Sequence, residues 1–182
     1  MECKERLLFL KDGRTARLRH ARPEDASTLL DLLRTTSAES RFLLREPEEV
    51  TMTVEEEETF ITARLEAPGQ ILLTIEMEGH LVGMDSLSGV GPFQRYTHRG
   101  VVALALRQSV WGQGLGRQLL TALLDIAKAA GYEQVELDVL ADNHRARSLY
   151  ESVGFTVTGT LPRNMKYKDG TYADAYFMVR EL

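Results

Sequence analysis

The sequence is poor in the residues that build covalent and metal-based scaffolds. It holds a single cysteine, Cys3, so no internal disulfide can form. Its four histidines stand far apart, at His20, His80, His98 and His144, and their positions lack the spacing of a zinc ligand set. We therefore expect neither a disulfide framework nor a bound metal ion.

Long hydrophobic runs are also missing. The longest uninterrupted apolar run covers only Val101–Leu106, which is too short to cross a bilayer. The stretch Met1–Leu10 carries charged side chains before a few apolar residues, unlike the hydrophobic core of a secretory signal. We expect no membrane association and, by default, a cytoplasmic location.

An excess of positive charge is absent as well. The 182 residues include 22 Lys and Arg against 27 Asp and Glu, a formal net charge of −5, which argues against a dedicated nucleic-acid-binding protein. Residues 1–91 hold 11 basic and 18 acidic side chains, a net of −7, whereas residues 92–182 hold 11 and 9, a net of +2. The acidic half includes the run Glu55–Glu58. This run indicates either a solvated helix face or an acidic rim that attracts a cationic substrate.

Turn and capping signals organise the first half of the chain. Hydrophobic residues make up 43% of the sequence, as in an ordinary globular domain, and we expect one α/β domain with a mixed sheet over residues 1–182. Asp12-Gly13 predicts a hairpin turn, Pro23 begins a helix, and Thr53 with Glu56 forms a capping box for a second helix. That second helix is expected to bury Phe60, Ile61, Ala63 and Leu65. A further hairpin is predicted over residues 71–77 and 81–87.

The second half alternates strands and helices. The apolar run Val101–Leu106 predicts a strand buried on both faces, and the leucine spacing after it predicts a helix from Leu115 to Ala130. Alternation predicts a strand over residues 135–139. A short helix over residues 143–153 and two strands over residues 155–161 and 172–179 complete the expected domain.

Three glycines at alternate positions mark the stretch Val110–Arg117. Glycines let the backbone turn tightly and present successive amide N–H groups to an anion, and the following helix N-terminus adds its positive dipole end. The stretch indicates either a phosphate cradle or a simple connection. A P-loop is excluded because Gly116 is followed by Arg117 and Gln118. Arg117 also stands where a dinucleotide-binding loop has its third glycine.

A second pattern, Asn-x-x-Ala-x-x-Leu-Tyr-x-x-x-Gly-Phe, runs from Asn143 to Phe155. Together with the loop Trp111–Gly116, it resembles the GCN5-related N-acetyltransferase (GNAT) superfamily, whose phosphate loop runs Arg/Gln-x-x-Gly-x-Gly/Ala. Trp111 departs from that loop pattern, and the departure looks like the branch of RimJ-type and spermidine acetyltransferases. The resemblance covers the chain from about Ile71 to its end.

This resemblance implies a mixed, mostly antiparallel sheet flanked by helices, in which two parallel central strands splay apart. It also implies acetyl-CoA as the cosubstrate, bound at the splay. Four arginines near the two motifs, at positions 107, 117, 145 and 147, offer positive charge for its phosphates. The residues implied to bind the cosubstrate are Leu104, Leu106, Gln113, Gly114, Leu115, Gly116, Arg117, Asn143 and Tyr150.

The implied reaction is the acetylation of a primary amine by direct attack in a ternary complex. Tyr150 is the candidate acid that protonates the departing thiolate. His98 is the first candidate for the general base because its ordinary pKa suits the task, with Asp85, Glu76 and a water relay as alternatives. Cys3 lies in a terminus expected to fray and is not expected to act as a nucleophile.

The acceptor stays open among a polyamine, an aminoglycoside, an amino acid and a protein N-terminus. Neither nucleic acid nor a membrane is an expected partner, and a homodimer is compatible with the sequence. The alternative function is a non-catalytic acyl-CoA-binding or sensor domain of the same fold. Tyr150 favours the enzyme, because a pure binding protein does not need the phenol.

Overall fold

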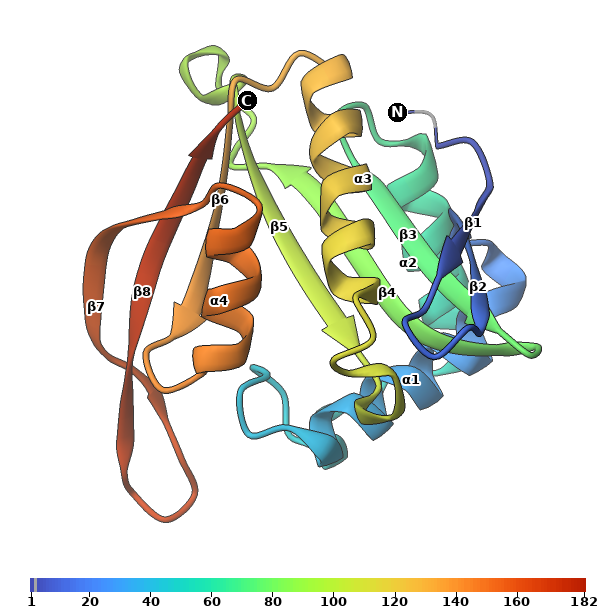
Figure 1. Ribbon diagram of the computed structural model, residues 1–182, viewed down its shortest axis with the longest axis horizontal. Coiled ribbons are helices and arrows are strands. Elements are labelled where there is room, and N and C mark those ends of the chain that lie inside the picture. The colour runs from blue at the N-terminus through green and yellow to red at the C-terminus, as the bar shows by residue number, and fades with distance from the viewer. Residues whose placement is uncertain (2) are drawn as a thin grey trace.

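The computed structural model describes residue 1 and residues 3–182, and in it eight strands form one mixed sheet with helices on both faces (Figure 1). The strand order is β1-β2-β3-β4-β5-β6-β8-β7. The strands are β1 (Arg6–Phe9), β2 (Thr15–His20), β3 (Ile71–Met77), β4 (His80–Gly89), β5 (Arg99–Leu106), β6 (Gln134–Leu140), β7 (Thr156–Lys166) and β8 (Tyr172–Glu181). The α-helices are α1 (Ala26–Glu39), α2 (Val54–Glu66), α3 (Leu115–Ala129) and α4 (His144–Ser152).

Local turn and capping chemistry confirms the expected order of elements. Gly13 adopts a φ of +89° in the turn between β1 and β2, a conformation that glycine reaches without strain. Thr53 caps α2: its hydroxyl accepts a hydrogen bond from the Glu56 amide, and the Glu56 carboxylate accepts one from the Thr53 amide. The mixed α/β fold is therefore the one that the sequence predicts.

The sheet opens between its two parallel strands. β5 and β6 pair only at Arg99 with Gln134, Gly100 with Val135, and Val101 with Glu136. Beyond this point both strands continue, β5 to Leu106 and β6 to Leu140, without further pairing. The other neighbouring strands are antiparallel. The separation leaves backbone N–H and C=O groups of both strands unpaired, so a ligand can bind there.

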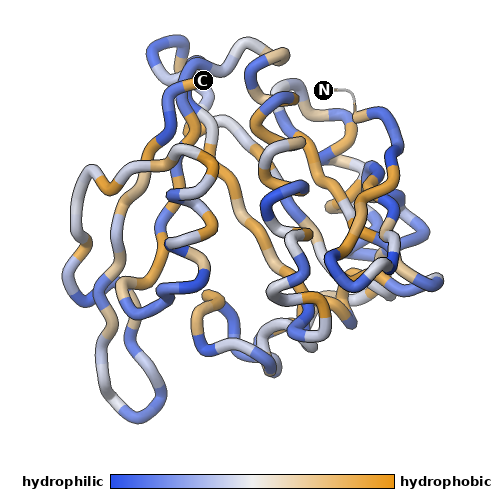
Figure 2. Tube along the Cα trace, viewed as in Figure 1, coloured by the Kyte–Doolittle hydropathy of each residue, from blue (hydrophilic) through white to orange (hydrophobic). Residues whose placement is uncertain are grey.

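β5 differs from its prediction. We expected both of its faces to be buried, but Val101 is 37% exposed, and Leu104 and Leu106 are only half-buried. Most of the strand is nevertheless hydrophobic (Figure 2). For Leu104 and Leu106 the cause is the early end of the pairing with β6, because the second half of β5 borders an opening where another strand would otherwise lie.

α2 also buries less than its sequence suggests. Ile61 is fully buried as expected, but Phe60, Ala63 and Leu65 are exposed, and Glu57 takes the second buried position. Only a narrow stripe of α2 packs against α1 and β3. The helix therefore contributes little more than Ile61 to the core beneath it.

Each face of the sheet has its own hydrophobic core. On one face, α3 contributes Leu115, Leu119 and Leu123, which join Phe155 in the larger cluster. On the other face, Leu29 and Leu32 of α1 pack with Ile61 and Leu72. None of the helices in the described part of the chain is long and apolar enough to cross a membrane.

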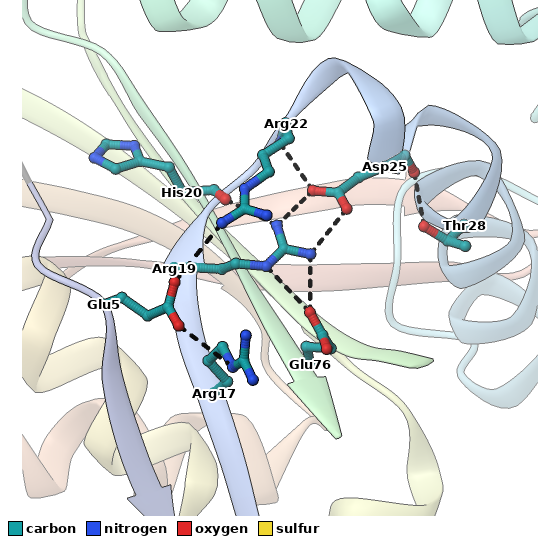
Figure 3. A network of polar contacts seen from close by, with 8 residues as sticks. All are labelled: Glu5, Arg17, Arg19, His20, Arg22, Asp25, Thr28 and Glu76. Atoms are coloured by element: carbon teal, nitrogen blue, oxygen red, sulfur yellow. Dashed lines mark hydrogen bonds and ion pairs between the residues drawn. The ribbon is translucent and has the colours of Figure 1, made fainter. Parts of the chain in front are cut away.

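A buried ion-pair network fixes the start of α1 to the sheet (Figure 3). Arg19 of β2 donates to both oxygens of Asp25, at 2.6 and 2.9 Å, and to Glu76 of β3 at 3.1 and 3.2 Å. Asp25 also accepts from the Arg22 amide. Glu76, one of the sequence-based candidates for a general base, is thereby held as a structural partner of Arg19.

Candidate active site

The glycine loop brings three elements into close contact at the start of α3. Gly112 and Gly114 have φ values of +75° and +82°, which favour glycine, and α3 begins immediately after them. Gly116 lies in the first turn of the helix. A Cβ there would stand 3.0 Å from Leu149 of α4 and 3.3 Å from Leu106 of β5. A glycine at this position therefore allows α3 to lie close to both neighbours.

A cleft of about 940 Å³ lies where β5 and β6 separate, and it runs from the glycine loop to the segment 40–44 after α1. Its walls come from β5, β6, α4 and the start of α3, with smaller contributions from β7 and β8. Most of the residues expected at a cosubstrate site line this single cleft: Leu104, Leu106, Gly114, Leu115, Gly116, Arg117, Asn143 and Tyr150.

Two of the expected site residues are not among the lining residues of the cleft. The Gln113 carbonyl accepts a hydrogen bond from the Lys11 amide. His98 precedes β5, at the far end of that strand from Leu106, and its carbonyl accepts hydrogen bonds from the amides of Glu133 and Gln134. His98 therefore helps to close the paired end of β5 and β6, away from Tyr150 and the glycine loop.

The basic side chains near the glycine loop differ from the four arginines expected from the sequence. Arg107 pairs with Asp31, and Arg147 pairs with Glu151, so both are held outside the cleft. Arg117 and Arg145 do line it. Lys11, from the turn between β1 and β2, is a third lining cation that sequence reasoning did not include.

Arg145 reaches the loop by stacking. Its guanidinium lies 4.6 Å from the ring centroid of Trp111, and the indole N–H of Trp111 donates to the Leu106 carbonyl at 2.8 Å. Trp111 therefore ties the loop to the end of β5 and presents a face on which the α4 arginine rests. Asn143 caps α4, since its side chain accepts from the Ala146 amide at 3.2 Å.

Tyr150 is half-buried between the cleft and the core. Its ring makes an edge contact with Phe155, with 5.8 Å between the centroids. Burial raises the pKa of the Tyr150 phenol well above its ordinary value, and a charge on Asp85 raises it further. The phenol thus keeps its proton at neutral pH and is available as a donor.

Asp85 of β4 is not among the residues that line the cleft, although its strand partner Leu104 does line it. The residue is fully buried on β4 and faces the same side of the sheet as its partner Leu104. Neither carboxyl oxygen has a hydrogen-bond partner among the described residues. Burial raises the pKa of Asp85 well above its usual range and so favours the neutral carboxyl, and burial is also the larger cause of the raised pKa of Tyr150.

Asp138 is the carboxylate that the sequence analysis missed. It lies on β6 two residues beyond the last pairing with β5 and is the only acidic side chain among the described residues that line the cleft. The residue is exposed, and the partial desolvation of its carboxylate raises its pKa, which the charge of Glu136 raises further. Because Val135, Leu137 and Val139 alternate with it, Asp138 resembles an outward polar position of a strand.

The far end of the cleft is mainly apolar. The segment after α1 contributes Phe42, Leu43 and Leu44, and Met165 of β7 lies there with Asn164. The Leu44 side chain is 86% exposed. The acidic rim, one of the two alternatives for Glu55–Glu58, does not line this end, because these residues are absent from the cleft. Glu46 and Glu48, in the same acidic half of the chain, pair with Lys168. No group of three or more His, Cys, Asp or Glu side chains in the described ranges could hold a metal ion.

Comparison with protein families gives one match of wide coverage. The family described as Acetyltransferase (GNAT) family matches residues 31–155. Among curated proteins, the chain is 38% identical over 106 residues to the N-alpha-acetyltransferase RimI of Mycobacterium tuberculosis, covering 57% of this chain and 61% of that protein. It is 29% identical over 114 residues to the L-amino acid N-acyltransferase MnaT of Escherichia coli, covering 63% and 66%. Each match spans less than two thirds of the relative's own length.

Solved structures are similar over almost the whole fold. An acetyltransferase of the GNAT family from Streptococcus pneumoniae has a TM-score of 0.87 and 27% identity, covering 92% of this chain and 99% of that one. A structure from Salmonella typhimurium, a protein called yncA with its cofactor acetyl-CoA, has a TM-score of 0.80 and 23% identity, covering 92% and 94%. The second likeness supports the fold alone.

Proposed function

Because the chain belongs to the acetyltransferase (GNAT) family, we propose that it is an acetyl-CoA-dependent N-acetyltransferase that acts on a primary amine. One observation carries the proposal beyond family membership: a single cleft combines the glycine loop, a protonated Tyr150 and the carboxylate Asp138. These are a cradle for the phosphates of the cosubstrate, an acid for the departing thiolate and a base for the attacking amine.

The residues of the cleft fit the proposed cosubstrate. The loop backbone before α3 and the cations Lys11, Arg117 and Arg145 suit phosphate groups. Beyond Val101 the edge of β5 is not paired with β6, so the backbone of Leu104 and the Leu106 amide are available to the amide groups of a pantetheine arm, while the Leu106 carbonyl already accepts from Trp111. When bound, acetyl-CoA supplies the thioester whose C–S bond breaks as the bond between carbon and the amine nitrogen forms.

Asp138 is the proposed general base, in place of His98. An amine arrives mainly as an ammonium ion and must lose a proton before its nitrogen can attack. Asp138 lies in the cleft with a raised pKa and can accept this proton, which then passes to solvent. His98 lies at the other end of β5 and has no such position.

Tyr150 is the proposed acid. Its phenol donates a proton to the sulfur of the leaving thiolate as the C–S bond breaks. The second proton of the attacking nitrogen then returns through solvent to the phenolate, so the Tyr150 side chain ends each cycle as it began. Direct attack in a ternary complex needs no covalent enzyme intermediate, and none of the residues lining the cleft is a cysteine.

The acceptor proposed here is an amine that carries an apolar group. Phe42, Leu43, Leu44 and Met165 provide a hydrophobic surface, and Asp138 offers one carboxylate to one ammonium group. This favours an amino acid or a protein N-terminus over a polyamine, in line with the amino acid in the name of MnaT and the α-amine in the name of RimI. The narrower likeness to RimJ-type and spermidine acetyltransferases rests on Trp111 and stays a prediction. The homodimer also stays a prediction from the sequence.

The test is an acceptor screen that follows release of free CoA thiol. The panel contains single amino acids and short peptides with apolar N-terminal residues, with spermidine and an aminoglycoside as the cationic alternatives. We expect turnover with the apolar amines and a loss of about 10²-fold or more in kcat for Tyr150→Phe. Acetyl-CoA binding by calorimetry without turnover on any acceptor would favour the non-catalytic sensor. Absence of acetyl-CoA binding would overturn the proposal.

A further inference from the structure

The N-terminal hairpin is attached to the glycine loop by hydrogen bonds across a long stretch of sequence. The Gln118 side chain of α3 accepts from the Phe9 amide at 3.2 Å and donates to the Phe9 carbonyl at 2.8 Å, although the two residues are 109 positions apart. Two residues later, the Lys11 amide donates to the Gln113 carbonyl at 3.2 Å. The turn between β1 and β2 is thereby held against the start of α3.

This attachment gives the Lys11 side chain a defined place. Its Cε atom lies 3.8 Å from the position that a Cβ on Gly114 would occupy, and the residue lines the same cleft as Arg117 and Arg145. Within the described part of the chain, Lys11 makes no ion pair. Its neighbour Asp12 is already bound to Arg14 at 2.8 Å. The ammonium group is therefore available to an anion beside the loop.

The loop needs such a cation because it carries none of its own before Arg117. From Val110 to Gly116 the sequence contains no basic residue, and Trp111 stands where the family resemblance leads us to expect Arg or Gln. Figure 1 shows the β1–β2 hairpin on one side of the start of α3 and α4, which carries Arg145, on the other. Positive charge thus reaches the loop from two elements that flank it.

We infer that Lys11 is a phosphate-binding residue of the acetyl-CoA site and that the N-terminal hairpin serves to deliver it. The inference rests on the proposed function, since the phosphate belongs to the proposed cosubstrate. Gln118 is the positioning residue, because its two hydrogen bonds to Phe9 hold the hairpin in place. The ligand chemistry is a phosphate group, either the pyrophosphate or the 3′-phosphate of CoA.

The primary experiment measures the Kd of CoA by calorimetry for the wild type, Lys11→Ala and Lys11→Arg. Loss of one charged hydrogen bond predicts a Kd about tenfold weaker for Lys11→Ala, and Lys11→Arg should remain within about threefold of the wild type. Lys128→Ala is the matched control. It removes one exposed positive charge from the last turn of α3, at the end of that helix away from the glycine loop, and should leave the Kd unchanged.

Two outcomes separate this inference from the proposed function. A wild type that binds no CoA overturns the proposed function. A wild type that binds CoA while Lys11→Ala binds it equally well overturns the role of Lys11 alone. Repeating the titrations with 3′-dephospho-CoA identifies the contact: the penalty of Lys11→Ala disappears if Lys11 binds the 3′-phosphate and persists if it binds the pyrophosphate. Either result supports the inference.

Gln118→Leu tests the positioning role. This variant should raise the Kd of CoA, as Lys11→Ala does. Adding Lys11→Ala to it should then raise the Kd by a smaller factor than Lys11→Ala does in the wild type. Full additivity of the two substitutions would contradict a shared action through the hairpin. Thermal unfolding of both variants checks that the domain remains folded, since Lys11 is exposed and Gln118 lies on the surface of α3.

Discussion

At the scale of single residues, the proposed base is Asp138, which was not among the candidates from the sequence, in place of His98. Asp138→Asn should lower kcat/KM by about 10²-fold at pH 7, because the acceptor amine then enters the reaction as an ammonium ion. The deficit should shrink as the pH rises towards the pKa of the amine, where the free base forms without help. The pH dependence of kcat/KM measures this.

The control variant is His98→Ala, which alters a side chain outside the cleft. It should show the same dependence of kcat/KM on pH as the wild type. Loss of activity in His98→Ala together with a normal Asp138→Asn would restore the sequence-based assignment. Asp138 escaped prediction because its function depends on where β6 leaves β5, and that separation depends on pairing along the whole sheet.

Asp85 leads to a second residue-scale prediction, on stability. Its pKa in the folded state is raised, so the native carboxyl retains a proton that the unfolded chain has released above about pH 4. The free energy of unfolding therefore loses a contribution as the pH rises from that value towards the folded pKa. Asp85→Asn removes this dependence, and its stability relative to the wild type should increase between pH 4 and pH 8.

Urea unfolding from pH 4 to pH 8 measures the difference in the free energy of unfolding between Asp85→Asn and the wild type. Asp125→Asn, which changes an exposed carboxylate on α3, serves as the control and should give a difference that varies little with pH. An Asp85→Asn difference that stays constant from acid to neutral pH would show that the buried carboxyl is ionised in the native state.

At the scale of elements, the attachment of α1 to the sheet depends on one buried arginine. Arg19→Met leaves Asp25 buried without its cation, and removing one member of such a pair costs about 3–5 kcal/mol in the free energy of unfolding. Urea denaturation measures the loss. The double variant Arg19→Met with Asp25→Leu removes both charges and should recover part of it. A double variant less stable than the single would mean that Asp25 stabilises the fold mainly through other contacts, such as the hydrogen bond that it accepts from the Arg22 amide.

Local signals predicted the elements better than they predicted the exposed faces. The capping box at Thr53 and the Asp12-Gly13 turn depend on neighbours in sequence, so they could be recognised without the fold. Phe60 and Leu65 are apolar and exposed, because the face of α2 that is buried depends on how α1 and β3 meet it. The buried Glu57 in the same helix carries no sequence signal at all.

At the scale of the whole molecule, some residues of the candidate site could be predicted from local sequence, and others depend on the complete fold. The glycine loop and the start of α4 are contiguous motifs, and their lining residues could be predicted from sequence. Lys11, Asp138 and the segment 40–44 come from three distant parts of the chain. They meet only because the sheet order places the β1–β2 hairpin beside α3 and separates β5 from β6.

The separation of β5 and β6 makes the stability of the whole domain responsive to the cosubstrate. The two halves of the sheet pair directly through only the first residues of β5, supported by the contacts of Arg99 with Glu136 at 2.7–3.1 Å. A molecule bound in the cleft contacts both strands beyond that point and should add about 2.7 kcal/mol at a concentration of 100 times its Kd. Thermal unfolding with increasing acetyl-CoA should show a rising Tm, and amide exchange should slow in residues 102–106 and 137–140. Exchange that slows only at the glycine loop would contradict bridging of the two strands.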